Sequence, residues 1–315
     1  MGGLKSLHLL YTGCEKGGAQ KVAIECANYN HDLCTSTVKT GGFLPLLQKK
    51  SLKTLEFYKL IFSNKFDIIY CSDPRALLFS FFAFRSILSK KYLILHSDRW
   101  IKNKIILMLF CKFFSINYIC TTKTQFDIFK KYSKDISLVR IVDIPKVKPA
   151  HQQDYGLLYF GRLDPIKNIQ IILDVFSNLR YKDDRFKLTI VGMGSQLIED
   201  VKGVSVIREW KSQNELEEIM KNSSFIVNAT DYEGFSLQLM EGISNGLFPL
   251  VGSNGLAVNY NLPKECFLNV DNIVEVVHLT NDKWQNVISK LQASLVEYLE
   301  STTHLKEFIR DEIKD

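Results

Sequence analysis

The fold of this chain is decided by residues 157–179, LLYFGRLDPIKNIQIILDVFSNL, in which a short apolar run is followed by a glycine and then by a longer amphipathic run. The apolar residues Leu157–Phe160 predict a buried strand, and Asn168–Leu179 predict a helix. Gly161 lets the backbone turn tightly between them. A strand joined to a helix in this way is the repeating unit of a parallel α/β sheet.

The same alternation continues along the chain. Further strands are predicted at Ser6–Tyr11, Asp67–Cys71, Tyr92–Leu95, Tyr118–Thr121, Lys187–Val191, Val204–Ile207 and Ser224–Val227, and helices at Ala19–Tyr29, Gln213–Lys221 and Ser236–Asn245. Residues 283–313 are predicted to be helical, because no Pro or Gly interrupts them. Residues 144–154 contain two prolines and no apolar periodicity, and are interpreted as a linker. We therefore expect two Rossmann-like domains, residues 1–148 and 149–315, facing a cleft at the carboxyl ends of their strands.

The composition excludes several classes of protein. The 315 residues are 46% hydrophobic and 23% charged, which is typical of a globular chain. No apolar run reaches the roughly 18 residues of a membrane span, and the N-terminal apolar run is too short for a secretory signal. The seven cysteines are scattered and contain no C-x-x-C pair. This pattern favours buried thiols in a reducing, cytoplasmic compartment over a disulfide framework or a zinc site.

Charge is distributed unevenly between the two halves. Residues 1–150 contain 24 Lys and Arg against 10 Asp and Glu, whereas residues 151–315 contain 16 against 24. A basic first half indicates an anionic partner, either nucleic acid or a lipid surface. Residues 102–114 mix bulky apolar side chains with three lysines, as helices on anionic membranes do. Residues 76–88 are interpreted as a core helix. We therefore expect peripheral contact with the inner face of the cytoplasmic membrane.

Two basic residues follow the turn at Gly161. Arg162 and Lys167 precede the predicted helix that begins at Asn168. The N-terminus of a helix itself favours anions, so two fixed cations at this place suit a diphosphate. The same residues would also be found in an ordinary strand-to-helix turn at a protein surface.

Residues 228–241, NATDYEGFSLQLME, form the second candidate stretch. A predicted strand ends before them and a helix opens near Ser236, which places Glu233 on a loop and Glu241 in the helix. Carboxylates in such places can bind sugar or ribose hydroxyls through charge-assisted hydrogen bonds. The amides at the start of the helix offer donors to phosphate; they belong to Gly234, Phe235, Ser236 and Leu237.

Taken together, the two stretches resemble family 4 of the retaining glycosyltransferases, the glycosyl transferases group 1, which have the GT-B fold. The resemblance rests on Gly-Arg-Leu-x-x-x-Lys-Asn followed about 70 residues later by Glu-x7-Glu, and it is strongest over residues 155–260. It implies that Arg162 and Lys167 neutralise the diphosphate of a nucleotide-sugar donor. It implies that Glu233 holds hydroxyls of the transferred sugar and that Glu241 binds the ribose. Such enzymes act without a bound metal or other cofactor.

The resemblance also implies a reaction course and roles in the first half. Retention at the anomeric carbon is expected, with the acceptor hydroxyl attacking as the diphosphate leaves, so that positioning and charge stabilisation carry catalysis. The loop over residues 13–20, GCEKGGAQ, is similar to a glycine-rich loop of the family, which would bring Gly17 and Gly18 near the donor phosphates. His96 is expected to contact the donor sugar and Asp73 to lie on the acceptor side. A histidine at a strand end is also compatible with a structural role.

These residues predict a hexosyltransferase that uses a nucleotide sugar, with UDP-sugars favoured over GDP-sugars. The expected acceptor is a lipid-linked or cell-surface glycan, such as a lipopolysaccharide, O-antigen or capsule precursor in polysaccharide biosynthesis. A nucleotide-sugar epimerase and a non-catalytic scaffold subunit of the same fold remain as alternatives. Departures from the family pattern at Trp210 and over residues 242–250, GISNGLFPL, leave the base and the sugar open. A nucleic-acid partner is not expected, because the chain has no helix-turn-helix, aromatic-sheet or zinc signature.

Overall fold

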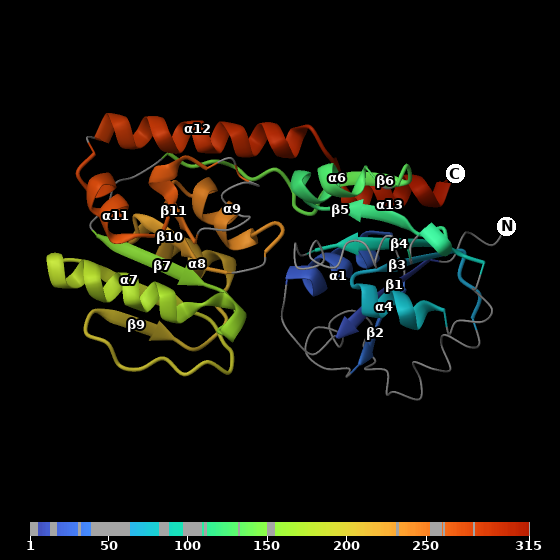
Figure 1. Cartoon of the computed structure of the whole chain (residues 1–315), viewed down its shortest axis with the longest axis horizontal. Coiled ribbons are helices and arrows are strands. Elements are labelled where there is room, and N and C mark those ends of the chain that lie inside the picture. The colour runs from blue at the N-terminus through green and yellow to red at the C-terminus, as the bar shows by residue number, and fades with distance from the viewer. Residues whose placement is uncertain are drawn as a thin grey trace. The chain divides into compact units, whose positions relative to one another are not determined.

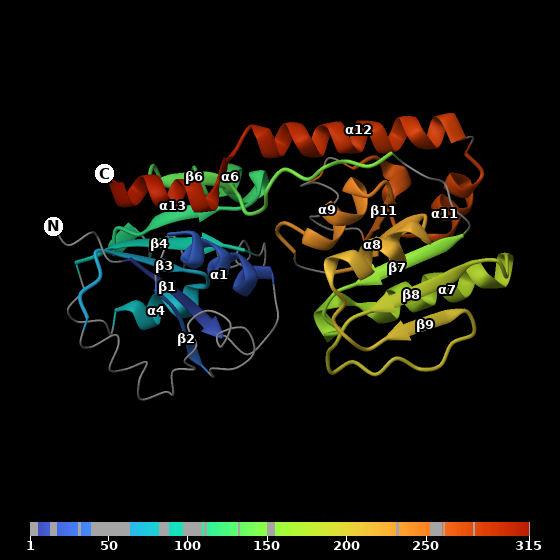
Figure 2. The same cartoon turned by 180° about the vertical axis from the view of Figure 1, so that it is seen from behind.

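The computed structural model describes residues 6–12, 18–30, 33–38, 64–81, 88–96, 109, 112–131, 133–149, 155–230, 233–252, 260, 262–279 and 281–314. Contacts divide the chain into two compact units. The first unit contains residues 1–143 and 302–315, and the second contains residues 144–301. Each unit is built around a parallel sheet of its own, as Figures 1 and 2 show from opposite sides.

The first unit has a sheet of seven described strands in the order β12-β6-β5-β4-β3-β1-β2. The strands are β1 (Ser6–Thr12), β2 (Leu33–Val38), β3 (Ile68–Cys71), β4 (Lys90–Leu95), β5 (Asn117–Cys120), β6 (Ile136–Arg140) and β12 (Thr303–His304). The described helices are α1 (Gly18–Asn30), α4 (Pro74–Ser80), α6 (Lys123–Phe129) and α13 (Leu305–Lys314). The strands predicted at β1, β3, β4 and β5 are confirmed, each to within two residues, whereas β2, β6 and β12 were not predicted.

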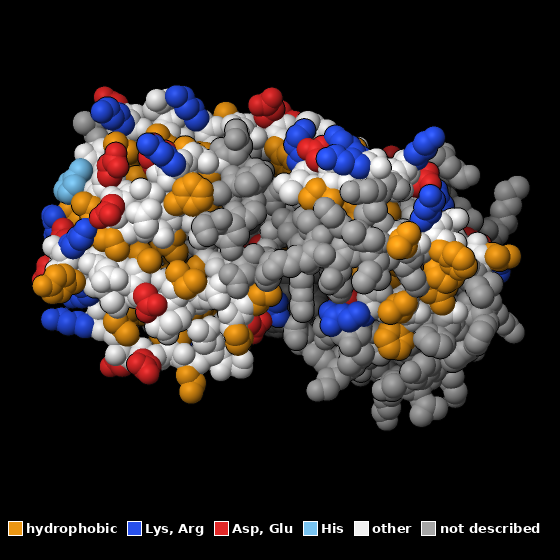
Figure 3. Space-filling model, viewed as in Figure 1, with side chains coloured by type: hydrophobic (Ala, Val, Ile, Leu, Met, Phe, Trp, Pro, Cys, Tyr) orange, Lys and Arg blue, Asp and Glu red, His pale blue; other side chains and the backbone are white. Residues whose placement is uncertain are grey.

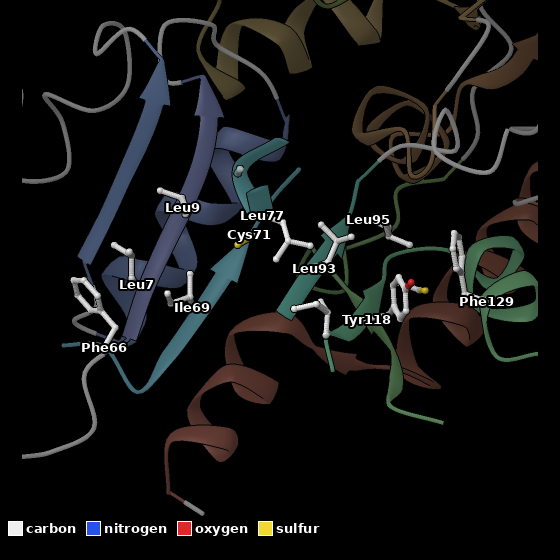
Figure 4. Close-up of a cluster of buried hydrophobic side chains, with 13 residues drawn as sticks. Leu7, Leu9, Phe66, Ile69, Cys71, Leu77, Leu93, Leu95, Tyr118 and Phe129 are labelled. Carbon is white, nitrogen blue, oxygen red and sulfur yellow. The ribbon is translucent and has the colours of Figure 1, made fainter. Parts of the chain in front are cut away.

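The core of the first unit forms where the central strands meet the helices. Figure 4 shows side chains from β1, β3, β4 and β5 in contact with residues of α4 and α6. Leu9, Ile69 and Leu93 are fully buried, and so is Phe129 of α6. Successive residues of β3 are all buried, because a parallel sheet is covered on both faces.

The C-terminal segment differs from the sequence prediction in two ways. Residues 283–313 were predicted to be helical throughout, but α12 (Asn281–Glu300) ends, and β12 precedes α13. Residues 302–315 were predicted to lie in the second domain, but their contacts place them in the first unit. The physical reason is tertiary, because Thr303 and His304 pair with Val139 and Arg140 of β6. Figure 1 shows α13, at the red end of the colour bar, beside β6.

Side-chain contacts attach α13 to the rest of the first unit. Lys90 of β4 forms an ion pair with Glu312 at 2.5 Å, and Tyr92 donates a hydrogen bond to the same carboxylate. The ammonium of Lys306 lies 5.6 Å from the ring centre of Tyr29 in α1. These contacts join the end of the chain to its first 100 residues, which sequence periodicity cannot indicate.

The second unit has a sheet of five described strands in the order β11-β10-β7-β8-β9, all parallel. The strands are β7 (Gly156–Phe160), β8 (Lys187–Val191), β9 (Val204–Ile207), β10 (Phe225–Asn228) and β11 (Phe248–Val251). The described helices are η3 (Pro165–Lys167), α7 (Ile169–Lys182), α8 (Gln213–Lys221), α9 (Leu237–Ser244), η4 (Lys264–Cys266), α11 (Val270–Val277) and α12. Helix α7 covers one face of the sheet, and α8 and α9 cover the other, as right-handed crossovers require (Figures 1 and 2).

The strands and helices predicted over residues 157–245 are confirmed, whereas β11 and α11 were not predicted. Helix α12 packs against α9, and its fully buried Trp284 lies 5.4 Å from the ring of Phe225 and 5.2 Å from that of Phe248. Such tilted aromatic contacts contribute about 0.5–1.5 kcal/mol beyond area burial. Neither α12, with 20 residues, nor any other helix in the described part of the chain is long and apolar enough to cross a membrane.

The cysteines that the structure describes behave as the sequence predicts. They are buried, namely Cys26, Cys34, Cys71, Cys120 and Cys266. Burial raises the pKa of the thiols of Cys34 and Cys266 to about 12, so both stay protonated and unreactive. Cys14 and Cys111 lie outside the described residues.

Candidate functional site

The two candidate stretches of the second unit follow neighbouring strands. Strand β10 pairs with β7 in parallel, with Phe225 opposite Leu157. The carboxyl ends of parallel neighbours lie at the same edge of the sheet, and open α/β sheets bind ligands at that edge. The residues after β7 and the residues after β10 are therefore brought together, although more than 60 positions separate them in the chain.

The turn after β7 is held by backbone hydrogen bonds to the residues at and after the end of β8 and by a side-chain hydrogen bond from Tyr159. The Gly161 amide donates to the Val191 carbonyl at 2.9 Å, and the Leu163 amide donates to the Met193 carbonyl at 2.8 Å. From beneath, the hydroxyl of buried Tyr159 donates to the Arg162 carbonyl at 2.8 Å. Burial raises the pKa of Tyr159, so this hydroxyl remains a donor at neutral pH. The backbone that carries Arg162 is thus preorganised.

Both predicted cations contact carboxylates at this edge. Lys167, at the end of η3, places its Nζ 2.9 Å from Oε2 of Glu233, and the side chains of this pair are only 17% and 21% exposed. The guanidinium of Arg162 lies 2.9 Å from the carboxylate of Asp164. Lys167 and Glu233, predicted to bind the diphosphate and the sugar, therefore lie within one hydrogen bond of each other.

Asn168 connects the two stretches at the start of α7. Its backbone is left-handed, with φ +50°, and its side-chain amide donates to the Ala229 carbonyl at 3.1 Å. Asparagine tolerates this conformation better than most residues. Because the side chain bonds across to the second loop, it makes no capping bond to the first turn of α7.

The loop after β10 leads into α9, as the sequence predicts. Ser236 is the N-cap, and its hydroxyl accepts the Leu239 amide at 3.3 Å. Glu233 lies on the loop, and Glu241 lies half-buried in α9, so the predicted division between loop and helix is confirmed. Gly234 is buried, and Leu237 is the first residue of the helix.

An aromatic stack supports the same loop. The ring of Phe235 is stacked with Tyr260 at 5.6 Å and with Tyr298 of α12 at 6.3 Å. The Tyr260 hydroxyl donates to the Ser236 carbonyl at 3.0 Å, and burial raises its pKa so that the proton is retained. The loop that presents Glu233 is therefore held on one side by aromatic rings.

The other predicted residues lie in the first unit. Asp73 is the N-cap of α4, and its two carboxylate oxygens bond the Arg75 guanidinium at 2.9 and 3.0 Å. Asp73 is thus engaged locally, and its contact with an acceptor stays a prediction. Gly18 is the first residue of α1, and Gly17 lies outside the described residues.

His96 directly follows β4 and has an unusual environment. Both ring nitrogens are buried, and neither has a hydrogen-bond partner among the described residues. Burial lowers the pKa of His96 to about 4 against the opposing charge of Asp73, so the ring is neutral at pH 7. A buried imidazole with both nitrogens unpaired is costly, which is compatible with the predicted contact to a polar ligand. That contact itself stays a prediction.

Sequence reasoning missed several residues that shape the site. Tyr159, Asn168, Gln238 and Tyr260 make the bonds described above or bond to Asn228. Asn228 could have been noticed as a polar residue that ends an apolar strand. Asn168 and Tyr260 have no local signal, since their partners are 61 and 24 positions away in the chain. No group of three or more metal-ligating side chains occurs in the described parts of the chain.

A model of a known protein family matches part of the second unit. Residues 154–266 match the family model described as Glycosyl transferases group 1. This range includes both candidate stretches and ends before α11. No curated protein matches the sequence.

Solved structures of the same fold match most or nearly all of the chain. Anabaena Alr3699/HepE, in complex with UDP-glucose, has a TM-score of 0.71 at 14% identity, covering 98% of each chain. S. aureus TarM, solved with fondaparinux, alpha-GlcNAc-glycerol and UDP, has a TM-score of 0.57 at 18% identity. That match covers 78% of this chain and 54% of TarM, so the chain spans about half of the TarM length.

A third structure agrees. An E. coli protein described as trehalose-6-phosphate, bound with UDP-2-fluoro glucose, has a TM-score of 0.63 at 10% identity, covering 99% of each chain. Identities this low establish the fold alone. The sequence expectation of two parallel-sheet units and of the GT-B fold is confirmed. Residues 154–266 match the Glycosyl transferases group 1 family, and the chain as a whole has the GT-B fold of the glycosyltransferases it resembles.

Proposed function

We propose that this protein is a retaining, metal-independent glycosyltransferase of family 4 that moves a hexose-type sugar from a UDP-sugar to a lipid-linked or cell-surface glycan. The observation that carries the proposal is the Lys167–Glu233 pair at 2.9 Å, on the sheet edge where β7 and β10 end. One unit thereby offers a cation for phosphate and a carboxylate for hydroxyls within a single sugar's length.

The leaving group is stabilised by the basic side chains. Arg162 and Lys167 neutralise the negative charge that develops on the diphosphate when the glycosidic bond to it breaks. The amides at the N-terminus of α9 add donors to the same phosphates. Because the backbone that carries Arg162 is already held in the turn after β7, this residue needs little reorganisation in the transition state.

The sugar and the ribose are held by carboxylates. Glu233 accepts hydrogen bonds from hydroxyls of the transferred sugar, and Glu241 binds the ribose. His96 contacts the sugar through a neutral imidazole, and Asp73 serves the acceptor side. The acceptor hydroxyl attacks on the face from which the diphosphate departs and gives its proton to that diphosphate, so that the anomeric configuration is retained.

Structures of similar fold support UDP as the nucleotide. HepE was solved with UDP-glucose, and TarM with UDP. Proteins that share the fold and bind the same nucleotide make UDP-sugars the first donors to test.

The donor is identified by thermal denaturation with a panel of UDP- and GDP-sugars. A ligand that binds only the folded protein stabilises it by about 2.7 kcal/mol at a hundredfold excess over its Kd. We expect a UDP-sugar to raise the melting temperature by a few degrees and to be hydrolysed slowly. Melting with free UDP and free GDP separates recognition of the base from recognition of the sugar.

The two alternatives predict different results in the same experiment. An epimerase would convert the bound nucleotide sugar into its isomer without releasing UDP. A scaffold subunit would show no hydrolysis and no stabilisation by any nucleotide, which would contradict the proposal.

We also propose that the first unit contacts an anionic membrane surface, where a lipopolysaccharide, O-antigen or capsule precursor would be presented. The support is an exposed apolar patch, defined as Leu109, Phe113 and Phe114, which are 65%, 82% and 42% exposed and which flank exposed Lys112. Phe113 and Phe114 are in edge-to-face contact at 4.9 Å. Figure 3 shows hydrophobic side chains at the surface of this unit. Residues 102–108 lie outside the described residues.

Replacing Phe113 by serine is expected to weaken binding to phosphatidylglycerol vesicles by about tenfold or more, because burying a Phe side chain is worth about 1.5–3 kcal/mol. Vesicle flotation at low salt measures the bound fraction. Leu197→Ser is the matched control, since Leu197 is 89% exposed in the second unit. Equal flotation of both variants, or no flotation of the unmodified protein, would rule out this surface.

A further inference from the structure

Asn228 ends β10 beneath the candidate site and is only 1% exposed. Its Oδ1 accepts the Thr230 amide at 2.9 Å. That bond determines which way the side-chain amide faces, because the oxygen must point toward the Thr230 N–H. The Nδ2 group is consequently directed at the loop and at α9.

The Nδ2 group of Asn228 meets three acceptors. They are Oε1 of Gln238 at 3.0 Å, Oγ of Ser236 at 3.1 Å and Oε2 of Glu233 at 3.4 Å. The other end of the Gln238 amide donates to the Val227 carbonyl at 3.0 Å, which sets its orientation as well. A buried network with every member bonded is rigid, and it specifies one arrangement of the groups that it joins.

Asn228 and Lys167 donate hydrogen bonds to the same oxygen of Glu233. Lys167 donates to Oε2 at 2.9 Å, and Asn228 reaches Oε2 from within the sheet edge. Oε1 of Glu233 has no hydrogen-bond partner among the described residues. One oxygen is therefore held by the protein, while the other can accept a hydroxyl.

Binding of a donor changes this arrangement, because Lys167 cannot serve a diphosphate and Glu233 fully at the same time. When the ammonium turns toward phosphate, its bond to Oε2 weakens. Asn228 cannot follow, since Thr230 and Gln238 fix its orientation. Its N–H is then the donor that keeps the carboxylate in place, and apo hydrogen bonds of this kind commonly shorten in the substrate complex.

We propose that Asn228 is a positioning residue that takes over Oε2 of Glu233 when Lys167 engages the donor diphosphate, so that Oε1 stays aimed at the sugar hydroxyls. This role rests on the proposed function, because it requires a nucleotide-sugar donor. The role predicts an effect on binding of the sugar half of the donor and not on binding of the nucleotide half. Loss of Asn228 weakens the sugar contact and leaves the phosphate contacts of Arg162 and Lys167 unchanged.

The test compares Asn228→Asp with the unmodified protein. Asp keeps the acceptor for the Thr230 amide, replaces the N–H donors by an acceptor oxygen and adds a negative charge beside Glu233. We expect kcat for UDP-sugar hydrolysis to fall roughly 10–100-fold, the range found when a partner that orients a functional ligand is lost. Affinity for free UDP, measured by calorimetry, is expected to stay within about threefold, whereas affinity for the UDP-sugar falls. Asn228→Ser adds no charge, so it separates loss of the amide contact from charge repulsion, and it also carries the test if the Asp variant does not fold.

A double-mutant cycle separates positioning from general stability. In a Glu233→Ala background, Asn228→Asp is expected to cause little further loss of kcat, because the group it positions is gone. Asn222→Asp is the matched control, since the Asn222 amide donates to the Glu218 carbonyl at the end of α8. Additive losses in the cycle, or equal losses of UDP and UDP-sugar affinity, would overturn the positioning role. Absence of UDP-sugar binding in the unmodified protein would instead overturn the proposed function, and this role with it.

Discussion

Replacing Lys167 by alanine is expected to slow donor cleavage by about 10²–10³-fold, the cost of removing one group that stabilises a developing oxyanion. The reason is that the Lys167 ammonium lies 2.9 Å from Glu233 at the edge where the diphosphate is proposed to bind. Without it, negative charge accumulates on the leaving phosphate beside a carboxylate that has lost its counterion. The measurement is the initial rate of UDP-sugar hydrolysis at saturating donor.

Two further variants sharpen this experiment. Lys167→Arg keeps the positive charge and is expected to recover part of the rate. Lys182→Ala is the control, because Lys182 pairs with Asp271 at 3.1 Å on an exposed surface of the same unit, where ion pairs contribute little. A Lys167→Ala variant that hydrolyses donor within threefold of the unmodified rate would contradict the assigned role.

Replacing Gly192 by alanine is expected to lower the free energy of unfolding of the second unit by about 2–5 kcal/mol. A Cβ at Gly192 would lie 1.8 Å from the carbonyl oxygen of Gly161, and its φ of +149° is strained for an L-residue. The obstacle is backbone, so the turn after β7 must move away from the end of β8. The 2.8 Å bond from the Leu163 amide to the Met193 carbonyl would be lost.

The same displacement affects function, because the turn that moves also carries Arg162. Gly192→Ala is therefore expected to weaken UDP binding as well as stability. Gly203→Ala serves as the comparison: its Cβ would meet the Arg180 guanidinium at 2.6 Å, and its φ is +88°. A flexible side chain can shift, so only the backbone strain of about 1–3 kcal/mol remains. Chemical denaturation of both variants measures the difference, and equal losses would contradict this account.

Local pattern is sufficient for much of the second unit. Lys187–Val191, Val204–Ile207 and Gln213–Lys221 were predicted with the bounds that the structure has. The two strands are short runs rich in β-branched residues, and the helix opens with a cap. The capping box of Ser212 and Glu215 is such a signal, because its two hydrogen bonds lie within one turn.

Elements that depend on a distant partner escaped prediction. Strand β12 has two residues and exists because it pairs with β6, more than 160 positions earlier. Strand β2, LCTSTV, is mostly polar or β-branched and has no apolar run of its own. The break between α12 and α13 was not predicted for the same reason, since neither Gly nor Pro marks it in the sequence. Tertiary pairing overrides local propensity in all three cases.

In the candidate site, too, relations between nearby residues were predicted, whereas contacts between distant residues were not. By itself, the sequence determined that Gly161 ends a strand, that Arg162 and Lys167 precede a helix, and that Glu233 lies on a loop ahead of Glu241 in a helix. These are relations between residues only a few positions apart, where chain geometry leaves few choices.

Only the tertiary structure decided that Lys167 meets Glu233, 66 residues away, and that Asn228 reaches the same carboxylate from within the sheet. The physical reason is the strand order, in which β10 returns to pair with β7 although β8 and β9 lie between them in the chain. Strand order is set by the burial of whole faces and by crossover handedness, which no short stretch of sequence contains.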